Sequence, residues 1–256
     1  MLVKSSFLRN VATVVACLAV CAVMMSCSKD KDNGDDGTEN GNGTENGLGV
    51  DKEPKLGNGN FGSTLTLKGQ VYINTNSYPD PYKKWTGNAT VYSEDFYGED
   101  GFITGKITNG QLNFSVGQPR ENIEYLSTLE GILCDAGQFN VPYHYDNVKV
   151  EPSGVKVFVL WGLTSEEYYG VYKENVTLSD EGMFQRFVIY FWVEKDVRLT
   201  AKGKIKDKYS STEDIDLQFK AGWNALYKKQ VWAENTPNLL KVADADLMWI
   251  IDLDND

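Results

Sequence analysis

The most constraining feature of this chain is a repeated alternation of apolar and polar side chains with a period of two residues. In residues 65–72, Leu65, Leu67 and Val71 share one parity with Gly69, and Thr, Lys, Gln and Tyr side chains take the other. The alternation recurs in residues 112–116, 155–161 and 215–219. Because a β-strand points successive side chains to opposite faces, this pattern predicts strands with one buried face.

Other signals agree with a strand-rich fold. Residues 184–193 (FQRFVIYFWV) are apolar nearly throughout, which predicts a central strand of a sandwich. Asn109-Gly110 is a strong two-residue hairpin turn, and Ala221-Gly222 marks a second turn. No long stretch has a helical period, although residues 164–171 suit one or two helical turns. The sequence therefore predicts an all-β fold, an antiparallel β-sandwich of immunoglobulin or prealbumin type, over residues 61–256.

One short sequence occurs twice. Residues 65–69 read LTLKG and residues 199–203 read LTAKG, with the glycine on the inward face in both. Such a glycine permits a bulge or the close approach of another strand. The echo has two interpretations. The body is either two packed sandwich units, divided near residues 118–122, or one domain with two similar strands.

The N-terminus has the layout of a bacterial lipoprotein signal. Lys4 and Arg9 precede an apolar run over residues 11–25, and small Ser26 stands directly before Cys27. This order predicts that residues 1–26 are a signal peptide, cleaved before Cys27, whose sulfur then receives lipid such as palmitate. An uncleaved membrane anchor is the alternative. Cys17 and Cys21 leave with the signal, so Cys134 is expected to be a lone, buried thiol.

Residues 27–60 carry almost no large apolar side chains. The stretch is acidic and rich in glycine and asparagine, and GTENG occurs at residues 37–41 and again at 43–47. Such a composition cannot bury enough surface to offset the entropy of ordering it. We therefore expect a lipidated cysteine followed by a disordered tether with a mean reach of roughly 30–35 Å.

The acidic run directly after Cys27 resembles the surface-export signal of Bacteroidetes-type lipoproteins. This resemblance implies an outer-membrane protein that faces the exterior; a solvated spacer in the periplasm is the alternative. The first half is similar to carboxypeptidase-regulatory-like domains, which have a prealbumin-type sandwich. Residues 69–71 (GQV), 87–91 (GNATV) and 109–114 (NGQLNF) carry the likeness. It implies a module for display or binding, and residues 74–86 are an insertion relative to it.

The charge balance excludes one class of partner. Removal of Lys4 and Arg9 with the signal leaves 23 basic against 36 acidic side chains, a net charge of −13. Binding to nucleic acid requires basic groups that neutralise phosphates, so no nucleic-acid partner is expected. The expected partners are a membrane, through the N-terminal lipid, and an extracellular glycan or protein.

Residues 72–85 (YINTNSYPDPYKKW) are the best candidate for a ligand site. Pro79 and Pro81 stiffen the loop. Flat aromatic rings bind sugar faces or peptide prolines at low entropic cost, and nearby amides and carboxylates add hydrogen bonds. The predicted ligand-binding residues are Tyr78, Tyr82, Trp85, Asn76 and Asp80. The alternative is that these rings cover the edge of the sandwich.

A basic strand offers a second surface. Five cations share one parity, namely Arg198, Lys202, Lys204, Lys206 and Lys208. They suit an acidic polysaccharide. Asp214 and Asp216 have matching parity on the next predicted strand, and we therefore favour cross-strand ion pairs.

The remaining polar groups do not predict a metal, a cofactor or a catalytic site. Two acidic clusters (Glu94, Asp95, Glu99 and Asp100; Asp252, Asp254 and Asp256) lack the ligand spacing of a calcium loop. His144 is the one histidine, and no serine has a nucleophile setting. We predict a surface protein without catalytic activity that binds a glycan or peptide. A structural subunit or adhesin is the alternative, and a hydrolase that uses a carboxylate pair is less favoured.

Overall fold

The computed structural model describes most of the body of the chain. The described residues are 53–75, 82–93, 104–119, 127–129, 145–160, 162–165, 170–179, 182–203, 205–207, 210–211, 213–232 and 239–252. All of them belong to one compact unit. The predictions for the signal, Cys27 and the tether as far as residue 52 lie outside them, as do those for Cys134 and His144.

The described residues form nineteen strands. The first ten are β1 (Asn60–Gly62), β2 (Leu65–Asn74), β3 (Tyr82–Lys84), β4 (Ala89–Tyr92), β5 (Thr104–Thr108), β6 (Gln111–Val116), β7 (Ser127–Thr128), β8 (Tyr145–Glu151), β9 (Lys156–Leu160) and β10 (Thr164–Ser165). The others are β11 (Gly170–Ser179), β12 (Gly182–Val193), β13 (Val197–Gly203), β14 (Ile205–Asp207), β15 (Ser210–Ser211), β16 (Ile215–Phe219), β17 (Gly222–Trp232), β18 (Leu239–Val242) and β19 (Met248–Asp252). The fold is all-β and sandwich-like, as the alternation predicts.

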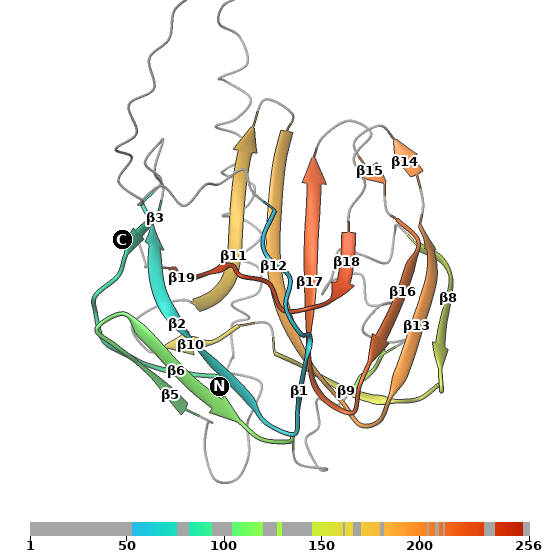
Figure 1. The fold of residues 1–256 in the computed structure, drawn as a ribbon, viewed down its shortest axis with the longest axis horizontal. Coiled ribbons are helices and arrows are strands. Elements are labelled where there is room, and N and C mark those ends of the chain that lie inside the picture. The colour runs from blue at the N-terminus through green and yellow to red at the C-terminus, as the bar shows by residue number, and fades with distance from the viewer. Residues whose placement is uncertain are drawn as a thin grey trace, which may run out of the picture. The chain divides into compact units, whose positions relative to one another are not determined.

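The strands form one large sheet and two small ones (Figure 1). Neighbours in the large sheet follow the order β1-β17-β12-β11-β19-β2-β6-β5-β4-β10, with β18, β3, β9 and β7 as side branches. A second sheet has the order β16-β13-β8, and β14 pairs with β15. The pairs are antiparallel except for β19 and β2, which are parallel over Val71–Ile73. The sheet is therefore mixed where the sequence predicts a purely antiparallel one.

Strands β12 and β17 are central because both of their faces are buried. On β12, Val188 and Tyr190 face one core, whereas Ile189 and Phe191 face another. The two strands pair over eleven consecutive positions, from Met183–Trp232 to Val193–Gly222. This explains why residues 184–193 are apolar without alternation, and it confirms the predicted central strand.

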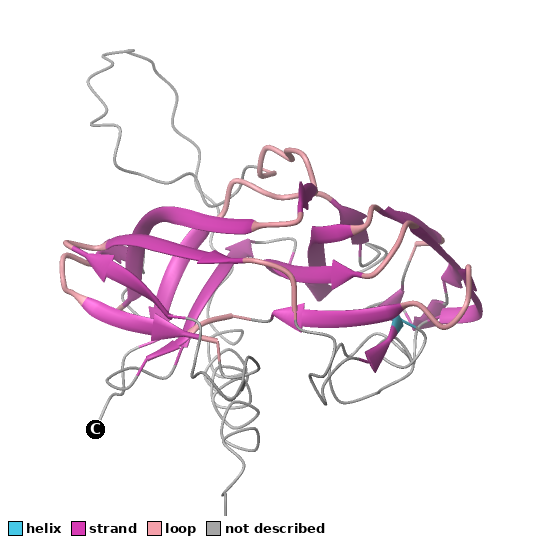
Figure 2. Cartoon of the chain, turned by 90° about the horizontal axis from the view of Figure 1, so that it is seen from below, coloured by secondary structure: helices cyan, strands magenta, loops and turns pink. Residues whose placement is uncertain are grey.

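Each face of the central strands carries its own hydrophobic core. The first core lies between the central strands and the half-sheet of β2, β6, β5 and β4, and its largest buried side chains are Trp223, Tyr227, Phe114 and Phe158. The second core lies between the central strands and the sheet of β16, β13 and β8. Its side chains include Leu199, Leu217 and Phe219. Figure 2 shows these strands stacked in layers, with little other structure in the described part of the chain.

Strand β2 belongs to both halves of the large sheet. Its residues 65–70 pair with β6, and its residues 72–74 pair with β3. The change falls at Val71, two residues after Gly69. Gly69 has a φ of +150°, and a Cβ there would lie 2.9 Å from the ring of Trp249. The Trp249 indole also donates a hydrogen bond to the Lys68 carbonyl (3.2 Å). A side chain at position 69 would displace that ring, so the inward glycine serves close packing, as the echo sequence predicts.

The predicted turns are present, and one local prediction is wrong. Asn109 (φ 49°) and Gly110 (φ 73°) join β5 to β6, and Gly222 (φ 99°) turns the chain into β17. Positive φ at both central residues is the geometry that suits a two-residue hairpin. Residues 164–165 and 170–171 are strand instead of helix, because Thr164 and Ser165 pair with Tyr92 and Val91.

The ordered body begins earlier than the sequence suggests. Residues 53–60, which the sequence places in the tether, form an N-terminal segment that lies across β12 and β17 (Figure 1). Its Gly57 amide donates to the Asp244 carbonyl (2.7 Å), and its Gly59 carbonyl accepts from Ala225 (2.7 Å). A short bridge also joins Leu56 to Ala245. Backbone pairing therefore holds residues 55–59 against the body, although this segment has few apolar side chains.

The shared central strands predict cooperative unfolding. Leu65→Ala in the first core and Leu199→Ala in the second should each lower the free energy of unfolding by about 2–5 kcal/mol, because both side chains are fully buried. Both variants should shift one and the same denaturant transition, seen together by tryptophan fluorescence and far-ultraviolet circular dichroism. The exposed Lys68→Ala is the control. Two separate transitions, one per core, would contradict a shared sheet.

Candidate functional site

The structure describes two of the five residues predicted to bind ligand. Tyr82, on β3, is 8% exposed and packs with Met248, Ile250 and Tyr72 on one face of the sheet. Trp85 is half-buried and packs against the first core. Both rings thus contribute to packing, which limits the ring surface that each can offer a ligand. Asn76, Tyr78 and Asp80 lie outside the described residues.

The base of the predicted loop is held by a polar network centred on Gln70. The Gln70 amide nitrogen donates to the carbonyls of Trp85 (2.9 Å) and Gly110 (3.2 Å), and its oxygen accepts from Gln111 (2.6 Å). The Trp85 amide donates to the Val71 carbonyl (2.9 Å). A Cβ at Gly110 would overlap the Trp85 carbonyl, so only glycine fits there. The two ends of the loop are therefore fixed to the hairpin turn between β5 and β6.

The basic strand forms the predicted cross-strand ion pairs. Arg198 donates two hydrogen bonds to Asp216 (2.8 and 2.6 Å), and Lys202 pairs with Asp214. All four side chains are at least half exposed. The pKa values of both aspartates are lowered, chiefly by these hydrogen bonds. Two of the five cations are thus already neutralised; the side chains of Lys204, Lys206 and Lys208 are outside the described part.

We also searched the described residues for metal-binding clusters and for membrane-spanning helices. Among these residues, no group of three His, Cys, Asp or Glu side chains is arranged to hold a metal ion. The acidic clusters at residues 94–100 and 254–256, and the side chain of Asp252, are not described. No helix in the described ranges is long and apolar enough to span a membrane.

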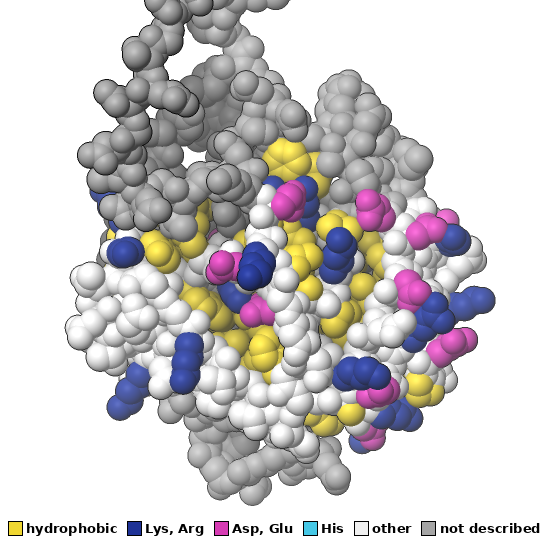
Figure 3. Space-filling view, in the orientation of Figure 1, with side chains coloured by type: hydrophobic (Ala, Val, Ile, Leu, Met, Phe, Trp, Pro, Cys, Tyr) yellow, Lys and Arg dark blue, Asp and Glu magenta, His cyan; other side chains and the backbone are white. Residues whose placement is uncertain are grey.

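The strongest polar cluster lies where the N-terminal segment meets the central strands. Arg186 on β12 and Lys229 on β17 are direct cross-strand partners on the face that also bears the first core. Their side chains are 4% and 16% exposed. Both cations lie over the ring of Phe184, at 5.4 and 5.1 Å from its centre. In Figure 3, basic and acidic side chains lie close together over hydrophobic ones at the centre of the face.

Glu53 supplies the negative charge for this pair. One of its carboxylate oxygens contacts both Lys229 and Arg186 (3.3 Å to the latter), and its side chain is 59% exposed. Partial burial raises the pKa of Glu53, but the hydrogen bonds and charges of Lys229 and Arg186 outweigh this and lower it overall. Burial, together with the Glu53 charge, raises the pKa of the neighbouring Tyr227 to about 12. The carboxylate of Glu53 is therefore ionised and the Tyr227 hydroxyl neutral at physiological pH.

A second ion pair fixes the chain between β18 and β19. Lys173 on β11 contacts Asp244 (2.6 Å) and lies 5.9 Å from the centre of the Trp249 ring. Tyr190 stacks on Trp249 and hydrogen-bonds Asp244, and its pKa is raised, first by burial and then by the Asp244 charge. Since the Gly57 amide also donates to Asp244, this residue links β11, β12 and the N-terminal segment.

The sequence analysis did not predict the cluster of Glu53, Arg186 and Lys229. One signal was available: Arg186 is the only charged residue in the apolar run of residues 184–193. A charge in a buried strand requires a partner. Nothing in the sequence identifies that partner as Glu53, which is 133 residues away and lies in a stretch with the composition of a tether.

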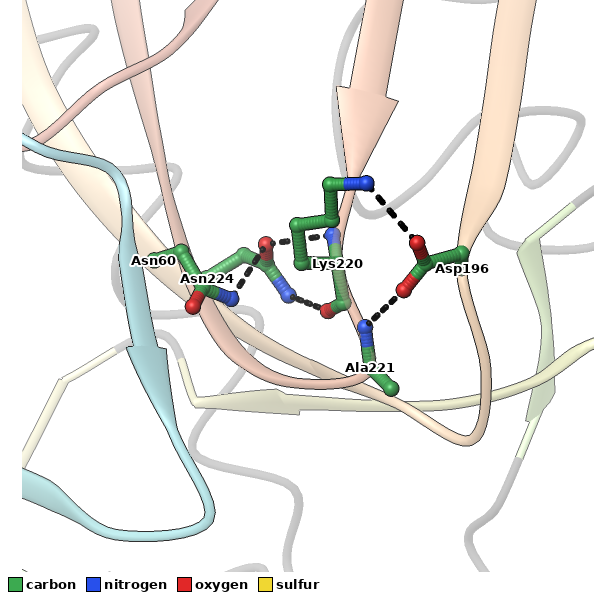
Figure 4. Close-up of polar contacts among 5 residues, drawn as sticks. All are labelled: Asn60, Asp196, Lys220, Ala221 and Asn224. Carbon is green, nitrogen blue, oxygen red and sulfur yellow. Dashed lines mark hydrogen bonds and ion pairs between the residues drawn. The ribbon is translucent and has the colours of Figure 1, made fainter.

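The connections between the central strands and the second core meet at another polar node (Figure 4). Asn224, fully buried at the start of β17, donates to the carbonyls of Lys220 (2.7 Å) and Gly222 (2.9 Å) and accepts from the Lys220 amide (3.0 Å). Asp196, in the turn after β12, accepts from the Ala221 amide (2.9 Å) and the Lys220 ammonium (2.8 Å). The node ties two turns together and is structural, because its groups satisfy one another.

Comparison of the chain with known protein families, with characterised proteins and with solved structures gave no match.

Asn224→Ala should destabilise the protein by about 2–4 kcal/mol, because it leaves buried backbone groups of the turn without partners. Gly222→Ala should have a comparable cost, since φ is +99° and a Cβ would overlap the Gly62 carbonyl. Gly154→Ala is the control, with positive φ but open space, and should cost less. Chemical denaturation measures all three. Equal stability of the Gly222 and Gly154 variants would contradict the close approach.

The Glu53 ion pairs should stabilise the fold in a pH-dependent way. Because its pKa is lowered in the folded state, Glu53 contributes stability above its ordinary value of 4.5, and this is lost as the pH falls through the folded value. Glu53→Gln should cost about 1 kcal/mol at pH 7, since the carboxylate is exposed but its partners are buried. The difference from wild type should shrink progressively as the pH falls below 4.5. A difference that is constant with pH would show that charge does not matter here.

Proposed function

We propose that this protein is a lipid-anchored binding protein of the outer membrane that faces the exterior and contacts an extracellular glycan or peptide. The signal layout before Cys27 supports the anchor, and the acidic run after it supports export to the surface. The proposal involves no catalytic step, cofactor or nucleic acid.

The observation that carries the binding role is the fixed base of the loop in residues 72–85. Binding residues concentrate on loops that a rigid scaffold positions. Here β2 and β3 hold the two ends, and Gln70 ties Trp85 to the turn at Gly110. Because the rings of Tyr82 and Trp85 contribute to packing, Tyr78, which directly precedes Pro79, becomes the main proposed contact residue.

The docked N-terminal segment supports display at a distance from the membrane. Residues 53–60 belong to the described body, so the proposed tether does not include them. Its junction with the body is fixed by Glu53 and by backbone hydrogen bonds at Gly57 and Gly59. A fixed junction restricts the orientations in which the head meets the membrane.

The anchor is tested by growing cells with labelled palmitate. Wild type should incorporate label and fractionate with the outer membrane, and surface protease should remove it from intact cells. Cys27→Ala should lose the label. Incorporation that persists in this variant would disprove lipidation at Cys27.

Ligand binding is tested on glycan and glycoprotein arrays with the full-length chain. Tyr78→Ala should reduce retention at least about tenfold without a change in thermal stability, as expected for an aromatic contact residue. Tyr82→Phe preserves the packed ring and is the matched control. Retention that is equal in Tyr78→Ala and wild type, or absent from every array, would contradict the assigned role of the loop.

A further inference from the structure

Arg186 and Lys229 place two positive charges directly opposite each other on neighbouring strands, which is unusual. Like charges directly opposite each other on one face of a sheet destabilise the pair. These two are direct partners in register, and both are largely buried. Burial increases their repulsion because the surroundings screen charge less than water does. An anion beside both cations therefore offsets their repulsion.

The groups around this position are arranged as a receptor for a carboxylate. A guanidinium and an ammonium converge on one carboxylate oxygen of Glu53, and the Phe184 ring lies beneath both cations. Charge-assisted hydrogen bonds of this kind are among the strongest in proteins. The cations belong to paired strands, whereas the carboxylate comes from the N-terminal segment ahead of β1. The receptor is thus built into the sheet, and its occupant is supplied by a separate segment of the chain.

We propose that Arg186, Lys229 and Phe184 form a carboxylate-binding site, which Glu53 fills from within the chain and which takes the carboxylate of a small organic acid when Glu53 is withdrawn. The carboxylate oxygens of Glu53 mark where the ligand's would lie. The 59% exposure of Glu53 means that its position opens to solvent, so a ligand reaches the cations without disrupting the core. This inference is independent of the proposed function and of the loop in residues 72–85.

Chemical rescue tests the site. In full-length Glu53→Ala, propionate should raise the thermal unfolding midpoint in a saturable way, whereas neutral propionamide should not. Wild type should respond at least about tenfold more weakly, because Glu53 competes at a high effective concentration. Glucuronate and N-acetylglutamate α-amide, tested in parallel, distinguish sugar acids from glutamyl side chains as the source of the carboxylate.

Two controls tie the rescue to this site. Glu194→Ala removes an exposed carboxylate elsewhere and should show no rescue. Lys229→Met in the Glu53→Ala background removes one of the two cations and should abolish the response. If Glu53→Ala is too unstable to purify, its refolding yield with propionate against propionamide gives the same comparison. Equal effects of propionate and propionamide, or equal responses of wild type and Glu53→Ala, would overturn the proposal.

Discussion

The structure depends on the burial of β12 and β17 on both faces. These strands pair along their full length, and each face packs a separate core. Because the two cores share the strands, neither is complete without them, and a division near residues 118–122 does not separate them. The first core combines β2 and β4–β6 with strands from the second half of the chain. The glycines of the repeated LTLKG and LTAKG sequences lie in strands that serve different cores, β2 and β13.

Because both faces of the central strands are buried, the charged side chains on these strands require partners. Arg186 and Lys229 are largely buried on the face that bears the first core, and Glu53 of the N-terminal segment pairs with both. Lys173 and Asp244 form a second ion pair of this kind. Lys228, on the opposite face, lies over Phe187, and burial lowers its pKa to about 8. The N-terminal segment is consequently part of the fold, although its composition is that of a linker.

Local patterns predicted most of the architecture. Alternation located β2, β6, β9 and β16, and the hairpin at Asn109-Gly110 and the ion pairs of Arg198 and Lys202 were also predicted. These features depend on residues close in sequence or on simple parity. The candidate ligand loop was predicted only as a cluster of rings, and the structure shows that Tyr82 and Trp85 are partly used for packing. Packing of these rings depends on strands that are distant in the sequence, such as β19, which lies beside β2.

The sequence by itself determined that this chain is a β-protein, because the period of side-chain burial is a local property. Only the tertiary structure decided that β2 and β19 are parallel, that one sheet serves two cores, and that Glu53 meets Arg186 and Lys229. These contacts join residues more than one hundred positions apart. Strand parity states which face is buried but not which strand lies beside it, since many pairings bury the same face equally well.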